Sequence, residues 1–67
     1  MFEVGMGIIR QYAKHTAEGE ITSIHDDEDG VTLISVLYTD GAVKIYSEDC
    51  VIANLGNRMI VTERVVW

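Results

Sequence analysis

Proline is absent from this sequence, cysteine occurs once, and basic side chains are few. Without proline, no ring fixes a loop or blunts the exposed edge of a strand. Because the single Cys50 has no partner for an internal disulfide, we expect a reducing, cytoplasmic setting. We interpret this thiol as a small buried hydrophobic group.

Long apolar runs are missing too. The first residues, MFEVGMGIIR, lack both the basic region and the apolar run of a signal peptide. No stretch approaches the roughly 20 apolar residues that span a bilayer. Since 48% of the 67 residues are hydrophobic, we expect a soluble globular protein with a single domain over residues 1–67.

Positive charge is scarce, because five basic residues stand against eleven acidic ones and give a net charge of −6. Nucleic-acid affinity comes largely from Lys and Arg at phosphates, so this balance makes a nucleic-acid partner an unfavourable hypothesis. It fits a basic protein partner, mimicry of nucleic-acid charge, or solubility alone.

What the sequence does contain is a strong hairpin signal. Residues 31–39 and 42–46 are rich in β-branched and aromatic residues and are joined at Asp40-Gly41, a pair that favours a two-residue type I′ turn. In the longer strand, Val31, Leu33, Ser35 and Leu37 share one face and Thr32, Ile34, Val36 and Tyr38 share the other. Both faces are largely apolar, which predicts a central strand covered on both sides for part of its length.

The other segments read as shorter strands and polar turns. Ile21 and Ile24 stand three residues apart in the second strand, which predicts a bulge, and Ser47 is a candidate cap for one helical turn. The expected strands are residues 2–10, 19–25, 31–39, 42–46, 51–55 and 59–67, with polar segments at 11–18, 26–30 and 47–50.

The order of these elements resembles an SH3-like barrel of the Tudor and KOW type. Three segments carry the resemblance: Gly19 with Ile21 and Ile24, the run Val36-Leu37-Tyr38-Thr39-Asp40-Gly41, and the run Tyr46-Ser47-Glu48-Asp49-Cys50-Val51. The match covers residues 4–55, with 56–67 as an extension. It implies an all-β fold, a small SH3-like barrel of five strands plus a C-terminal extra strand. The short, acidic, proline-free chain also looks like small accessory proteins of bacteriophages.

In Tudor domains, tyrosines and an acidic neighbour form an aromatic cage for methylated lysine or arginine. Across the predicted hairpin, Tyr38 and Tyr46 fall near one another on one face, with Asp40 at its end, and Tyr38 stands where the family commonly has a cage aromatic. Tyr12 is the only aromatic residue in the loop before the second strand. The sequence therefore lacks the further aromatic side chains that a full cage requires. The alternative is that one tyrosine packs at the rim of the barrel and the other is half exposed.

Catalytic and metal-binding patterns are weak. Aligning Gly30 with the glycine of an EF-hand loop puts His25 and Val36 at ligand positions that they do not suit, so we interpret residues 26–30 as a solvated turn. Nothing in the spacing brings Cys50 to His15 or His25 as a nucleophile with its base. We therefore expect no enzyme, no metal and no cofactor.

The apolar end, MIVTERVVW, leaves two alternatives open: it closes the barrel, or it pairs with another chain. We predict a non-catalytic module that binds a protein partner through Tyr38, Asp40 and Tyr46 or through the strand ending at Trp67, which also offers a contact for a homo-oligomer. The alternative is an acidic inhibitor or decoy that presents an acidic surface of Asp26, Asp27, Glu28, Asp29, Glu48 and Asp49 to a basic protein. A third hypothesis, a KOW-like nucleic-acid-associated domain, requires the five basic residues to gather on one face.

Overall fold

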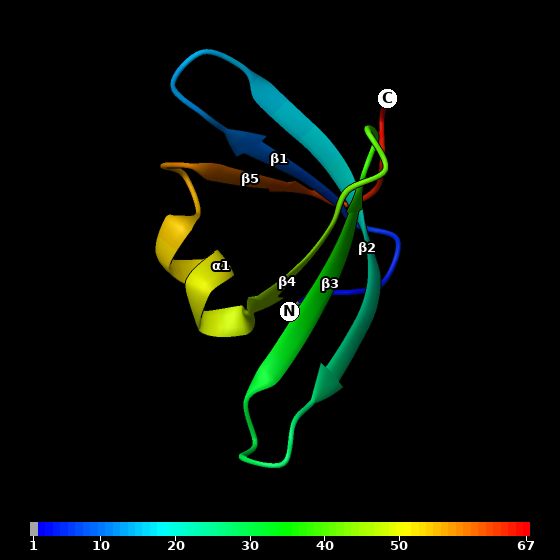
Figure 1. Ribbon diagram of the computed structural model, residues 1–67, viewed down its shortest axis with the longest axis vertical. Helices are drawn as coiled ribbons and strands as arrows, with labels where there is room; N and C mark the ends of the chain where they lie inside the picture. The colour runs from blue at the N-terminus through cyan, green and yellow to red at the C-terminus, as the bar shows by residue number, and fades with distance from the viewer. Residues whose placement is uncertain (1) are drawn as a thin grey trace.

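The computed structural model describes residues 2–67 as one antiparallel sheet of five strands with a single short helix (Figure 1). The elements are β1 (Gly7–Gln11), β2 (Thr16–Asp26), β3 (Thr32–Tyr38), β4 (Val43–Ser47), α1 (Glu48–Asn54) and β5 (Met59–Thr62). The strand order across the sheet is β4-β3-β2-β1-β5. The expected all-β class is therefore confirmed. No helix in the described residues has the length and apolarity that a membrane crossing requires.

Strand β2 is the longest element and joins the two halves of the sheet. Its first residues pair with β1, and the stretch from Gly19 to Asp26 pairs with β3. The register shifts between Ile21 and Ser23, which confirms the bulge predicted from the isoleucine spacing. A bulge increases strand bending and twist, and Figure 1 shows β2 curving along the length of the molecule.

The core collects side chains from all five strands and the helix. Strand β3 supplies its even-numbered positions from Ile34 to Tyr38, and the buried apolar residues of the described chain are Ile8, Ile21, Ile34, Val36, Tyr38, Tyr46, Val51 and Met59. The opposite face of β3 is more open, with Leu37 exposed and Leu33 and Ser35 partly buried. The two faces predicted for β3 are thus correct, and the even-numbered face lies against the core.

The β3–β4 turn differs from the prediction. Gly41 N–H donates to the Tyr38 carbonyl at 2.9 Å, and Tyr38 N–H donates to the Ala42 carbonyl at 2.8 Å. Only Gly41 has a positive φ here, 90°, and Asp40 does not. The connection is therefore a three-residue loop of residues 39–41 with glycine at its left-handed position, rather than a type I′ turn.

The predicted strand over residues 51–55 is wrong, because most of this segment belongs to α1. The Ser47 hydroxyl accepts a hydrogen bond from the Cys50 N–H at 3.2 Å, and Glu48 and Asp49 occupy the first turn. Capping and acidic residues at this end favour a helix. Its one buried residue, Val51, packs in the core and attaches the helix to the sheet. Cys50 is exposed, so the expectation of a buried thiol is also wrong.

The C-terminal segment adds an edge strand to the sheet of its own chain. Strand β5 pairs with β1, Arg10 opposite Met59, and Met59 is buried in the core. It is the fifth strand of the sheet, so residue 56 does not divide a core from an extension. Beyond β5 the tail folds back over β1: a Cβ added at Gly7 would lie 2.7 Å from the Trp67 ring, which remains 38% exposed.

Candidate functional site

Tyr38 and Tyr46 meet inside the protein rather than on an exposed face. Their hydroxyl oxygens are 2.8 Å apart, and the side chains are only 4% and 9% exposed. Their predicted proximity is confirmed, but they form no open aromatic surface. Asp40 lies apart from them in the exposed turn, where a carboxylate oxygen accepts a hydrogen bond from the Ala42 N–H at 2.9 Å.

Arg10 covers this tyrosine pair. It follows Ile8 by two residues on β1, so it takes the next position on the inward face of the strand. One guanidinium N–H donates to the Tyr46 hydroxyl at 2.9 Å, and the guanidinium carbon lies 5.5 Å from the centre of the Tyr46 ring. The same carbon lies 5.1 Å from the Tyr12 ring. These contacts hold the cation over aromatic faces.

The hairpin between β1 and β2 supports Arg10 from the other side. Tyr12 stacks on His15 with ring centres 4.7 Å apart and planes 14° from parallel. The Tyr12 N–H also donates to the His15 carbonyl at 2.8 Å, which closes the turn. Tyr12 is thus engaged by two side chains and does not serve as a free cage wall.

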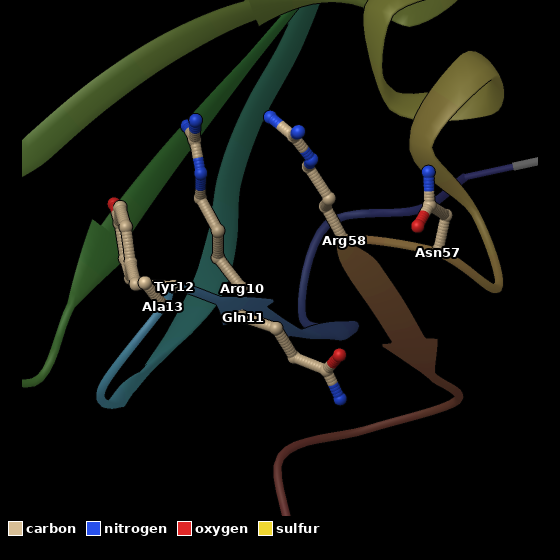
Figure 2. A pocket seen from close by; sticks show the side chains of 6 residues that line it. All are labelled: Arg10, Gln11, Tyr12, Ala13, Asn57 and Arg58. Carbon is tan, nitrogen blue, oxygen red and sulfur yellow. The ribbon is translucent and has the colours of Figure 1, made fainter.

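A pocket of about 430 Å³ opens beside Arg10 (Figure 2). Its lining residues come from the end of β1, the hairpin turn that follows and the turn before β5: Arg10, Gln11, Tyr12, Ala13, Asn57 and Arg58. In Figure 2 the Arg10 and Arg58 side chains extend in the same direction, whereas the Gln11 side chain points the other way. Arg58 lies just before β5, so its side chain need not follow the alternating side-chain directions of a strand. It can therefore lie next to the Arg10 side chain.

Two arginines make the pocket positively charged, and one of them, Arg10, is held in place by its contacts with tyrosines. The hydrogen bond to the Tyr46 hydroxyl raises the pKa of Arg10, with burial acting in the opposite sense, and the groups that act on this arginine are tyrosines rather than carboxylates. Burial, followed by the hydrogen bond with Tyr46, raises the pKa of Tyr38, so its hydroxyl stays neutral. Chemically the arrangement offers N–H donors and positive charge to an anion.

The residues of the predicted acidic surface do not line this pocket. Glu48 and Asp49 of α1 line a second, smaller pocket of about 170 Å³ together with Gly30, Val31 and Thr32. The two acidic segments predicted from the sequence thus approach one another. The acidic turn 26–30 lies at the bottom of Figure 1, and the β1–β2 hairpin lies at the top.

Part of the acidic turn has a structural role. One Asp27 carboxylate oxygen accepts hydrogen bonds from the Asp29 N–H at 2.8 Å and the Val31 N–H at 2.9 Å. Asp26 accepts one from the Thr32 hydroxyl at 2.7 Å. These carboxylates shape the turn, as Asp side chains commonly do. Among residues 2–67, no three His, Cys, Asp or Glu side chains come together in a way suited to a metal ion.

Two surface features were missed by sequence reasoning. One is the Arg10–Arg58 pocket, for which the signal was an arginine at an inward position of the first strand. The other is an apolar strip on the outer face of the hairpin, formed by Leu37, Val43 and Ile45, which are 45%, 61% and 62% exposed. Its signal was the apolar character of both faces of the third strand, which was interpreted as burial.

Comparisons with protein-family models, with curated proteins and with solved structures find no match to this chain.

Proposed function

We propose that this chain is a non-catalytic, cytoplasmic interaction module with an SH3-like barrel fold. Five antiparallel strands, a tight β3–β4 hairpin and a short helical segment before the last strand support the fold proposal. The free thiol of Cys50 supports a reducing compartment. The pocket lining, two arginines with amide side chains, supports binding rather than nucleophilic chemistry.

The surface proposed for the partner is the apolar strip of Leu37, Val43 and Ile45. These side chains lie on β3 and on β4, which is an edge strand of the sheet. The strip is thus next to backbone groups that no further strand of residues 2–67 pairs with. An extended partner segment that adds to this edge gains main-chain hydrogen bonds and apolar contacts together. The exposed strip is the observation that carries the proposal.

Charge specifies the partner further. Strand β4 leads directly into Glu48 and Asp49, which are near the acidic turn. We therefore propose an extended segment with apolar side chains and basic flanking residues. Tyr38 and Tyr46 belong to the buried core and are not part of the strip. Trp67 packs near Gly7 of β1, away from the strip.

The test compares capture by the unaltered protein with capture by a Val43→Ser/Ile45→Ser variant. A partner from the native host that binds the strip is lost by this variant and retained by the control Ile60→Ser, which alters an exposed isoleucine on β5. Calorimetry then measures how tightly the unaltered protein and each variant bind an extended peptide taken from this partner. Equal binding by both variants contradicts the proposal, and concentration-dependent dimerisation abolished by V43S/I45S assigns the strip to a second copy instead.

The acidic decoy remains the second candidate, supported by the approach of Glu48 and Asp49 to the acidic turn. Surface electrostatics are screened within about 8 Å at physiological salt. Capture that collapses between low and moderate salt, and that V43S/I45S leaves intact, favours this decoy. Salt-tolerant capture that the double variant removes favours the apolar strip.

A further inference from the structure

We propose that the pocket between Arg10 and Arg58 binds a phosphate monoester group. The proposal concerns the face of the molecule that carries the β1–β2 hairpin and does not rest on the proposed apolar strip. Although the net charge of the chain is −6, two of its five basic residues line this one pocket.

Arg10 is held in place before any ligand arrives. Its guanidinium is fixed by the 2.9 Å hydrogen bond to Tyr46 and by the rings of Tyr12 and Tyr46. An arginine has five N–H donors, and the hydrogen bond to Tyr46 occupies one nitrogen, so the others remain to bind an anion. A preorganised side chain loses little conformational freedom on binding, which favours affinity.

Arg58 supplies a second cation, and its guanidinium makes no stabilising contact within the described residues. Within residues 2–67 its guanidinium has no hydrogen-bonded or stacked partner, and the side chain stands beside Arg10 along the pocket (Figure 2). Both arginines line the same pocket, so an anion bound there accepts charge-assisted hydrogen bonds from two guanidinium groups.

The pair of arginines selects among anions. A phosphate monoester carries a charge of about −1.5 to −2 at neutral pH, which matches two cations, whereas a carboxylate or a phosphodiester carries only −1. The volume of about 430 Å³ is within the usual range for small-ligand sites and leaves space for the group esterified to the phosphate. Asn57, at the same rim, offers an amide to that group. A cationic ligand such as methyl-lysine is repelled.

The outer surface argues for a monoester rather than a nucleic-acid backbone. Continuous phosphodiester binding requires several cations along a track, but Lys14, Lys44 and Arg64 do not line this pocket. An isolated two-arginine site fits one terminal phosphate, on a small molecule or on a phosphorylated side chain of a peptide.

The test uses the whole protein at low ionic strength with four probes: inorganic phosphate, phenyl phosphate, a phosphoserine peptide and a single-stranded oligonucleotide without terminal phosphates. Dissociation constants are measured by titration, and the arginine Nε–H signals are followed by NMR. We expect phenyl phosphate or the phosphopeptide to shift the Arg10 and Arg58 signals and to bind more tightly than the oligonucleotide. The better of these two probes tells whether the source is a small molecule or a peptide.

Arg58→Gln is the decisive variant, because this exposed side chain can be changed without disturbing the core. Losing one charge-assisted interaction is expected to weaken binding about tenfold. The control Arg64→Gln removes the same charge outside the pocket and is expected to change affinity less than about twofold. Equal losses in both variants, tighter binding of the oligonucleotide, binding of inorganic phosphate alone, or unshifted arginine signals at millimolar probe each overturn the proposal.

Discussion

At the scale of single residues, the buried hydroxyl pair of Tyr38 and Tyr46 links stability to alkaline pH. Burial raises the pKa of Tyr38 above its ordinary value near 10. The folded state therefore binds the phenolic proton more tightly than the unfolded state. Its contribution to stability is present in full below about pH 10 and is lost as the pH rises beyond that value.

We therefore expect the free energy of unfolding to fall as the pH rises beyond about 10, and to fall less steeply in Tyr38→Phe. Urea unfolding at several pH values measures both slopes. The matched control is Tyr12→Phe, which removes the same hydroxyl from an exposed side chain and should retain the slope of the unaltered protein. If Y38F and Y12F respond alike to pH, the buried pair is not the source of the alkaline sensitivity.

The same residues show what alternation can and cannot tell. Alternation correctly placed Tyr38 with Ile34 and Val36 on one face of the third strand. It did not tell which face lies inside when both are apolar. That choice depends on where β1 and β5 bring Arg10 and Met59, which is a long-range property.

At the scale of elements, α1 depends on its cap. A seven-residue helix is too short to be stable by propensity alone, so the Ser47 hydroxyl and the burial of Val51 hold it together. We expect Ser47→Ala to lower the free energy of unfolding by about 1 kcal/mol. Ser47→Asp retains an acceptor and should keep most of that stability. Denaturant unfolding checks both, and equal stability of all three proteins contradicts the role of the cap.

Local patterns were informative for some elements and ambiguous for others. The bulge in β2 and the Ser47 cap were predicted because each depends on neighbouring residues. Residues 51–55 satisfied two local patterns at once, a short apolar run and a capped turn. Burial of Val51 alone, with Ile52 exposed, decided for the helix, and a short apolar run cannot reveal this in advance.

At the scale of the whole molecule, stability rests on a core of few side chains, one of which comes from β5. Met59 is 2% exposed, and truncating a buried methionine to alanine typically destabilises a protein by about 2–5 kcal/mol. We expect Met59→Ala to lose a large part of the total stability, which is modest in a domain of this size. Ile60→Ala, on the exposed side of the same strand, should change it by much less. Thermal unfolding of both variants tests this, and similar melting temperatures contradict it.

The pairing of β1 with β5 has a consequence for the order of folding. Strands β1 to β4 follow one another as sequential neighbours, whereas β5 must return across the rest of the chain to reach β1. Contacts between distant segments are slow to form because the chain loses entropy on closing a long loop. Arg58 immediately precedes β5, so the phosphate pocket is complete only after this late closure. A bound phosphate that contacts both Arg10 and Arg58 would therefore slow the separation of β1 from β5, the two strands that pair last.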